Sequence, residues 1–386
     1  MAQLIKKGKY FCIFFIVLFL LTSCWDKQEI DDQQFVISIG IDKNMEDTIS
    51  SNVLPNRYLI TYTTPNLATI QSKGGGGTEP SRFSQSTVGD TMTGTTKKAI
   101  THYLEPLNFD HVKTIILGKA LAEDKRLVQE VLDYLDRNPQ FSRTIPIFIA
   151  DGTAKEILEQ KEEGRTFRNR YAIQDRDITA IPDELIIDIG KVLSQLENSG
   201  GTTFIPKIFI SEKNIGISGG AIFRDYQFQG WLEEREVRAL SWLLGKNRRG
   251  YFPISYQETY IPYEVSNVTS NLISASYDEF LKVKLEIKTE GDMSEYTLDS
   301  SQFPINTEWI KEIEDEMEKQ IEKEIKELIY KLQREYKVDI LRLNNKIRIK
   351  YPEIWKEIEK DYEKIFENAQ IEVEIKLSIR RIGMYL

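Results

Sequence analysis

The side chains best suited to covalent chemistry in this sequence are two cysteines and two histidines. Cys12 lies inside an apolar run, and Cys24 lies where that run gives way to a polar stretch. A thiolate is a strong nucleophile, so Cys24 is well placed to accept a covalent group. His102 and His111 belong to no HExxH or HxH pattern, which favours structural roles for both. The abundant carboxylates single out no pair. We therefore predict no catalytic residues, no metal site and no enzymatic activity.

The residues before Cys24 have the order of an export signal. Lys6, Lys7 and Lys9 precede an unbroken apolar run of twelve residues, from Tyr10 to Leu21. A membrane-spanning helix needs about 20 apolar residues, so this run is too short for a comfortable span. A charged start, a short apolar core and then a small residue are typical of a secretory signal peptide.

The residues Leu21-Thr22-Ser23-Cys24 resemble the lipobox of bacterial lipoproteins. The resemblance implies that Cys24 carries a diacylglyceryl group in thioether linkage and that signal peptidase II cuts between Ser23 and Cys24. By the same resemblance, the amino group freed on Cys24 would be available for a further acylation. Residues 1–23 would be discarded, and the two acyl chains would anchor the protein stably, where one chain binds only marginally. Two other interpretations stay open: an ordinary cleaved signal with an incidental cysteine, and a short uncut anchor.

The charge balance excludes several classes of partner and site. The formal net charge is −9, and removal of the three lysines with residues 1–23 takes it to −12. Such a chain lacks the clustered Lys and Arg that a nucleic-acid backbone requires, so we expect no nucleic-acid partner. Two cysteines supply neither a disulfide framework nor a cysteine-rich metal site. The lipid on Cys24 is the only non-protein group that we expect, and we predict no cofactor.

Strand and helix patterns alternate over residues 24–200, which we predict to be an N-terminal α+β region of one or two domains. Alternation over residues 35–41 and 57–64 predicts a hairpin, and the apolar runs at 111–118 and 144–150 predict buried strands. Helical spacing covers residues 90–104, 124–137, 153–161 and 183–196. Residues 66–90 include four consecutive glycines and predict a flexible loop, without the lysine of a phosphate-binding loop. The Asn198-Ser199-Gly200-Gly201 cluster predicts the boundary with a second region.

Residues 201–386 predict a C-terminal α+β domain. Two strands, at 281–288 and 371–379, each have an apolar face and a charged face, and we expect them to be neighbours with Lys282 and Lys284 near Glu372 and Glu374. Between them, a long amphipathic helix is predicted over residues 307–336, lying on a sheet. Its apolar stripe is Ile310, Ile313, Met317, Ile321, Ile325, Leu328 and Leu332. The predicted fold class is therefore α+β and multidomain, with mixed or antiparallel sheets flanked by helices.

Several segments together resemble the Ger(x)C family, the lipoprotein C subunits of spore germinant receptors. The start "LTSCWDKQEIDDQQFVISIGIDK" carries the family's lipobox cysteine followed by Trp-Asp and a strand that ends Gly-Ile-Asp. The later segments fall in the family's order: "FDHVKTIILG", "DYLDRNPQFSRTIPIFIA", "GGAIFRDYQFQGWLEEREVRALSWLLGK", "YPEIWKEI" and "EVEIKLSIRRIG". The similarity covers essentially the whole chain.

This resemblance implies a fold, a location and partners. The implied fold has three α+β domains without enzymatic activity. Family members are held by lipid on the outer face of the spore inner membrane of endospore-forming bacteria. There they form a complex with two membrane-spanning subunits, A and B, and are needed for the nutrient response that ends dormancy. Because nutrient binding is generally attributed to the membrane subunits, the resemblance implies assembly or signal coupling for this chain and leaves direct nutrient binding undecided.

Two rival classes share the N-terminal features. A lipid-anchored solute-binding protein would have repeated strand and helix units that form two parallel-sheet lobes. A lipid-anchored hydrolase would need a nucleophile or metal set that the sequence does not display. Aromatic residues concentrate between residues 226 and 263, where they suit a core or an interface, and we favour the core.

Overall fold

The structure is a computed structural model that describes residues 33–45, 56–66, 82–102, 106–160, 185–198, 201–212, 214–246, 250–256, 259–293 and 306–382. These residues form an eight-stranded sheet, a four-stranded sheet and a two-stranded sheet, with helices packed on the larger two. None of the helices in these ranges is long and apolar enough to cross a membrane. The predicted signal peptide, Cys24 and the rest of the lipobox lie outside the described residues.

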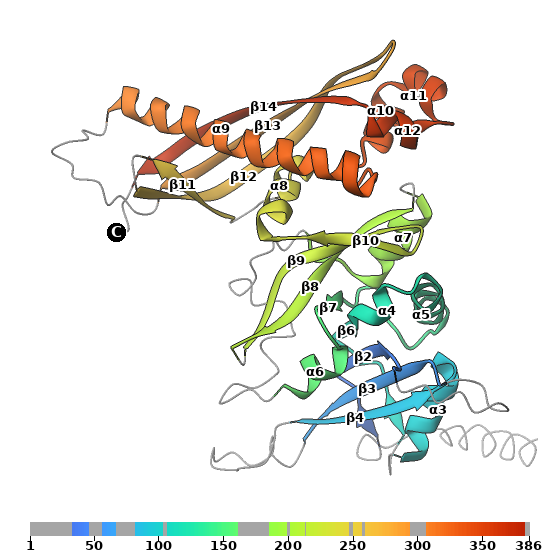
Figure 1. Cartoon of the computed structure of the whole chain (residues 1–386). Coiled ribbons are helices and arrows are strands. Elements are labelled where there is room, and N and C mark those ends of the chain that lie inside the picture. Colours follow the sequence, from blue (N-terminus) through green and yellow to red (C-terminus); the bar gives the residue numbers. More distant parts are fainter. Residues whose placement is uncertain are drawn as a thin grey trace, which may run out of the picture.

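The eight-stranded sheet has the strand order β10-β9-β8-β7-β6-β2-β3-β4 (Figure 1). Strands β2, β6, β7 and β8 run parallel to one another, and both ends of the sheet are antiparallel. Parallel strands are usually covered on both faces, and every residue of β6 and β7 is buried. The strands are β2 (Ser38–Lys43), β3 (Tyr58–Pro65), β4 (Arg82–Gly89), β6 (Thr114–Leu117), β7 (Ile147–Ala150), β8 (Thr202–Ser211), β9 (Asn214–Arg224) and β10 (Gln227–Leu232).

Helices cover both faces of this sheet. On one face lie α3 (Met92–His102), α4 (Lys119–Ala122), α5 (Lys125–Arg137) and α7 (Ile189–Asn198). On the other face α6 (Ala154–Glu159) packs against β6 and β7. The predicted helix at 124–137 is confirmed, and Asp124 caps it by accepting a hydrogen bond from the Leu127 backbone N–H at 3.3 Å.

A buried carboxylate joins β2 to α6. The two carboxylate oxygens of Asp42 accept hydrogen bonds from the backbone N–H groups of Ala154 at 2.8 Å and Lys155 at 2.9 Å. Burial raises the pKa of Asp42 to about 6, although these two hydrogen bonds favour the charged form. The side chain thus satisfies donors in the first turn of α6 that would otherwise lack partners.

The predicted hairpin of residues 35–41 and 57–64 is confirmed, since β2 and β3 pair antiparallel. The predicted loop at 66–90 is wrong for residues 82–89, which form β4 and pair with β3 in continuous register. Its sequence, "RFSQSTVG", has no apolar alternation because much of β4 stays partly exposed. Ser and Thr hydroxyls join the two strands, at 2.8 Å between Thr61 and Ser86 and 3.1 Å between Thr63 and Ser84.

The sheet also includes β8, β9 and β10, which follow the 198–201 cluster. The division of the chain into domains stays a prediction.

The four-stranded sheet has the order β11-β12-β13-β14, with β11 (Tyr251–Tyr256), β12 (Thr259–Tyr277), β13 (Leu281–Met293) and β14 (Gln370–Ile382). The predicted pairing of the two charged strands is confirmed, because β13 and β14 are parallel neighbours. Lys284 Nζ lies 3.0 Å from a carboxylate oxygen of Glu372 and of Glu374. Lys282 instead lies opposite Gln370 in the register.

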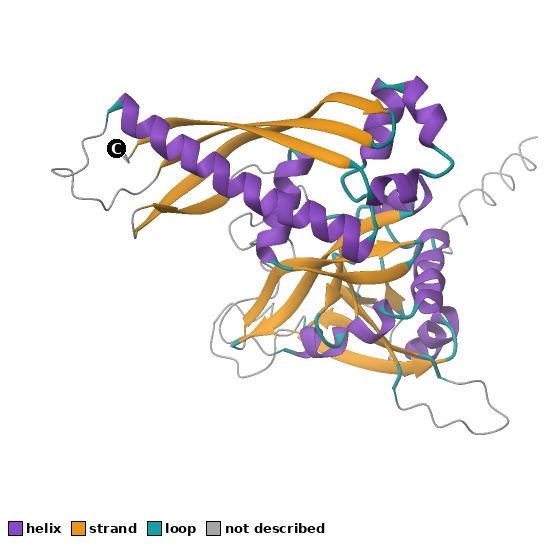
Figure 2. Cartoon of the chain, turned by 45° about the horizontal axis from the view of Figure 1, so that its top comes forward, coloured by secondary structure: helices purple, strands orange, loops and turns teal. Residues whose placement is uncertain are grey.

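The predicted long helix is confirmed as α9 (Thr307–Lys331), which lies across one face of the four-stranded sheet (Figure 2). Its apolar stripe is buried from Ile313 to Leu328, whereas Ile310 is only partly buried. Residues Leu332–Tyr336 continue it as a π-helical turn, η4. The short helices α10 (Leu343–Lys350), α11 (Pro352–Ile358) and α12 (Tyr362–Glu367) gather at one end of this sheet.

Helix α8 (Glu234–Leu244) lies between the two large sheets (Figure 1). Its apolar residues belong to one continuous core with Phe204 and Ile222 of the eight-stranded sheet and with α9. Arg238 of α8 donates two hydrogen bonds to the Glu324 carboxylate of α9, at 3.2 and 2.7 Å. This shared core and bidentate pair join the C-terminal unit to the larger sheet.

Candidate functional site

The chain that leads away from Cys24 reaches the folded body at β1 (Gln34–Phe35). Strand β1 pairs in parallel with β5 (Leu107–Asn108), and the Asn108 side chain donates to Gln33 Oε1 at 2.6 Å. Phe35 packs edge-on against the His111 ring, with centroids 5.1 Å apart, which supports the structural role predicted for His111. Nine positions separate Gln33 from Cys24, and a fully extended chain of that length spans about 30 Å. The predicted lipidation residues Leu21, Thr22, Ser23 and Cys24 are outside the described residues and stay predictions.

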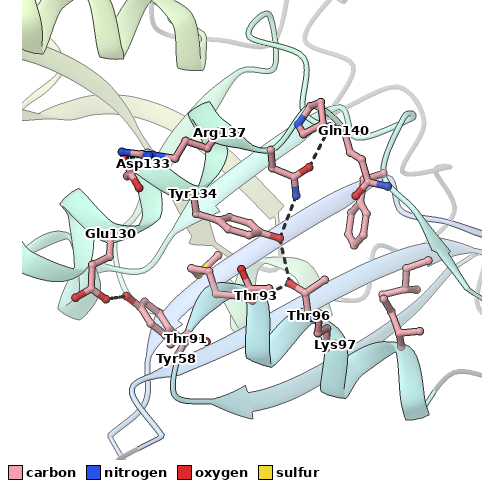
Figure 3. A pocket seen from close by; sticks show the side chains of 16 residues that line it. Tyr58, Thr91, Thr93, Thr96, Lys97, Glu130, Asp133, Tyr134, Arg137 and Gln140 are labelled. Atoms are coloured by element: carbon pink, nitrogen blue, oxygen red, sulfur yellow. Dashed lines mark hydrogen bonds and ion pairs between the residues drawn. The ribbon is translucent and has the colours of Figure 1, made fainter.

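Beside this attachment lies an open cavity of about 660 Å³ between α3 and α5 (Figure 3). Leu107 of β5 and the adjacent Phe109 form part of its wall, so the cavity and the attachment of β1 share one element. The remaining lining residues are Tyr58, Thr91, Met92, Thr93, Thr96, Lys97, Ile100, Glu130, Asp133, Tyr134, Arg137, Asn138, Pro139 and Gln140.

A charged cluster centred on Glu130 forms one end of the cavity. The Glu130 carboxylate accepts hydrogen bonds from Arg57 Nη1 at 2.9 Å, Tyr58 OH at 2.5 Å and Arg126 Nε at 2.9 Å. The Arg57 hydrogen bond contributes most to lowering the pKa of Glu130, to about 2. Burial, with the Glu130 hydrogen bond as the next cause, raises the pKa of Tyr58. A carboxylate with such a low pKa is a poor general base near neutral pH, so this cluster is suited to binding and structure.

A chain of hydroxyl and amide groups forms the second polar wall (Figure 3). Thr96 Oγ1 donates to the Met92 carbonyl at 2.9 Å and lies 2.9 Å from Tyr62 OH and 3.3 Å from Tyr134 OH. Asn138 Nδ2 donates to Tyr134 OH at 3.3 Å. These hydroxyl groups thus already form hydrogen bonds with groups of the chain itself. Lys97, by contrast, forms no ion pair with any described residue and is exposed at the cavity.

The sequence did not reveal this cavity. Arg57 and Tyr58 lie 73 and 72 positions from Glu130, and no short motif connects them. Across the described ranges, no group of three His, Cys, Asp or Glu residues is arranged to hold a metal ion. Among the described residues, the cavity therefore combines apolar lining side chains, hydrogen-bonded polar walls and one cation without an ion pair, an arrangement suited to binding.

The aromatic residues between 226 and 263 divide between two environments. Trp242 and Tyr263 are fully buried in the core that joins the two sheets, which agrees with the favoured interpretation. Tyr251 and Tyr260 are exposed, at 58% and 71%. Trp231 is partly buried and packs edge-on against Phe228 at 5.2 Å.

Comparison with known proteins identifies two family matches that follow each other along the chain. Residues 26–210 match the family described as "Spore germination protein N-terminal domain", and residues 218–383 match "Spore germination B3/ GerAC like, C-terminal". Spore germination protein A3 of Bacillus subtilis (strain 168) is 26% identical over 380 residues, which cover 98% of each chain. Spore germination protein B3 of the same organism is 22% identical over 397 residues, covering 98% of this chain and 99% of the relative.

A solved structure has the same fold. The crystal structure of the GerBC protein superposes with a TM-score of 0.60 at 19% identity, covering 89% of this chain and 96% of that one. The α+β architecture with a long late helix is thus common to both molecules.

Proposed function

The chain belongs to the Ger(x)C family of spore germination proteins, and we propose that it is the lipid-anchored C subunit of a nutrient germinant receptor. In this role it has no enzymatic activity and acts by assembly or signal coupling with the membrane subunits A and B. The observation that carries the proposal is the pair of family matches, which together run from residue 26 to residue 383 and begin two positions after Cys24.

We propose that Cys24 is the point of attachment to the membrane. Cleavage before Cys24 removes residues 1–23, and the diacylglyceryl group replaces the signal peptide as the membrane anchor. The folded body then begins about 30 Å or less from the lipid, because a chain of nine residues spans at most about that distance. The protein sits on the extracytoplasmic face, on the spore inner membrane. Its lipid is its only non-protein group.

The alternative function, a lipid-anchored solute-binding protein, has less support. Two parallel-sheet lobes around a central cleft are expected of that class, whereas the described chain has one mixed eight-stranded sheet and a separate four-stranded sheet. The cavity lies between α3 and α5 on one sheet. Titration calorimetry with nutrient amino acids and sugars separates the two functions: tight binding by the chain without subunits A and B would favour the solute-binding protein.

Deletion of the gene, followed by measurement of nutrient-triggered spore germination, tests the proposal. We expect germination to be lost for at least one nutrient and restored by the wild-type gene. Unimpaired germination with every nutrient would refute the assignment. For the anchor, Cys24→Ala should abolish incorporation of labelled lipid and leave the precursor uncut. A Cys12→Ala variant, altered inside the discarded segment, should be labelled and cut like wild type. Labelled lipid on the Cys24→Ala variant would refute the lipobox assignment.

A further inference from the structure

The two large sheets have four outer strands: β4 and β10 in one, β11 and β14 in the other. An outer strand presents unpaired backbone N–H and C=O groups, which attract further strands unless they are protected. Side chains of one helical segment, α9 and its continuation η4, hydrogen-bond to backbone groups on three of these four strands.

On β14, the backbone N–H groups of Leu377 and Ile379 donate to the carboxylates of Glu318 and Glu314, both at 2.8 Å. On β11, the Gln320 side chain donates to the Ser255 carbonyl at 2.8 Å and accepts from the Ser255 N–H at 3.4 Å.

On β10, the Trp231 carbonyl accepts hydrogen bonds from Tyr336 OH at 2.7 Å and Lys331 Nζ at 3.2 Å. Side chains therefore occupy backbone groups at which a further strand would pair on each of these three edges.

Strand β4 differs from these three edges. From Phe83 to Gly89, no side chain in the described part of the structure bonds to a backbone group of β4. The strand is eight residues long, has no bulge in its register with β3, and contains neither Lys nor Pro, which are common means of blocking strand addition. Two apolar side chains on it, Phe83 and Val88, are exposed at 53% and 39%.

The position of β4 indicates what could pair with it. The Ile37 N–H, close to the attachment of β1, donates to the Thr63 carbonyl of β3 at 2.8 Å, and Thr63 lies opposite Ser84 of β4. Two strand spacings, about 10 Å, therefore separate β4 from Ile37, which follows β1 closely in the chain. Strand β4 also lies at the end of the molecule away from the four-stranded sheet (Figure 1). With the lipid on Cys24, the short chain from Cys24 to Gln33 keeps this edge within reach of the membrane.

We propose that β4 is the docking edge for an extended extracytoplasmic segment of a membrane-embedded receptor subunit, which adds to the sheet as a further strand. This inference rests on the proposed function and names the surface through which assembly occurs. Backbone hydrogen bonds along β4 supply the affinity. Because β4 has only Arg82 as a charged residue, the incoming segment is uncharged along its centre and has apolar side chains that cover Phe83 and Val88.

A matched pair of substitutions tests the proposal in the full-length, membrane-bound protein. Gln85 lies on the open edge strand β4, and Gln227 lies on the closed edge strand β10 of the same sheet. Gln85→Lys should reduce the amount of membrane subunit that co-purifies with the chain by about fivefold or more, because lysine on an edge opposes strand addition. Gln227→Lys should leave it unchanged.

Cross-linking supplies a second readout that does not depend on weakening the complex. Cys24 and Cys12 are the only cysteines, so Gln85→Cys carries one free thiol after lipidation and cleavage, to which a photoactivatable cross-linker is attached. We expect an adduct with a membrane subunit from position 85 and none from a Gln227→Cys control.

Equal co-purification with both lysine variants, or an adduct that joins two copies of this chain, would overturn the inference and leave the proposed function intact. Failure of the wild-type chain to co-purify any membrane subunit would refute both.

Discussion

The charged cluster at the cavity allows a quantitative prediction about Glu130. In Glu130→Gln the carboxylate is lost, while the two arginines and Tyr58 that converge on it remain. The pKa of Glu130 falls from its ordinary value of 4.5 to about 2 in the folded chain. A shift of that size corresponds to about 3.4 kcal/mol of stabilisation by the charged form. The Glu130 side chain is 32% exposed, so solvent screening reduces the expected cost to about 2 kcal/mol at pH 7.

The cost of Glu130→Gln in unfolding free energy should depend on pH. A carboxylate with a depressed pKa stabilises the folded state above its unfolded pKa, and this stabilisation is lost as the pH falls through the folded pKa. The difference in unfolding free energy between wild type and Glu130→Gln should therefore shrink from about 2 kcal/mol at pH 7 to about 1 kcal/mol at pH 3.

Urea unfolding of a truncated chain that begins after Cys24, monitored by circular dichroism at both pH values, measures this difference. Asp133→Asn is the control, because Asp133 lies on the same helix and its ion pair with Arg137 is exposed. That substitution should cost less than about 0.5 kcal/mol. A cost for Glu130→Gln that is the same at pH 7 and pH 3 would show that the carboxylate charge does not hold the cluster together.

Three further predictions concern the interior. A Cβ on Gly118 would lie 1.9 Å from Asp42 Oδ1, so Gly118→Ala should destabilise the chain by about 2–3 kcal/mol in urea unfolding. In an Asp42→Ala background the same substitution should cost under about 1 kcal/mol, and strictly additive costs would contradict the clash. Because the folded pKa of Asp42 is raised to about 6, its contribution to stability falls as the pH rises from about 4 to about 6. Asp42→Asn should abolish that fall, and identical pH profiles of wild type and variant would count against it. Ile321→Ala, at the fully buried centre of α9, should cost about 2–5 kcal/mol in thermal unfolding, whereas Tyr330→Ala, 64% exposed, should change stability by less than about 0.5 kcal/mol.

The elements predicted correctly from the sequence are those whose buried apolar residues recur at a regular spacing. The stripe from Ile313 to Leu328 is buried because α9 packs on a sheet along its length. The two charged strands are neighbours, and Lys284 bridges Glu372 and Glu374. Their parallel direction was not predictable, because side-chain alternation has the same period in either direction.

The features that the sequence concealed depend on contacts between distant residues. Strand β4 has no apolar alternation, and pairing with β3 through Ser and Thr hydroxyls stabilises it instead. The Glu130 cluster unites β3 with α5 across more than 70 positions. Asp42 is one acid among 60 Asp and Glu residues, and only the placement of α6 above it reveals its role.

The side chains that protect three sheet edges belong to α9 and η4, late in the chain. These edges therefore stay unprotected until the C-terminal part of the chain has been synthesised. The Trp231 carbonyl on β10 is bonded by Lys331, which is 100 positions later in the chain. At about 5–20 residues per second, synthesis of the intervening segment takes about 5–20 s. Until Lys331 and Tyr336 have been synthesised, the edge of β10 is open to pairing with strands of other chains. The region after Asn306 therefore protects these edges only late in synthesis, and chains truncated before Thr307 should aggregate.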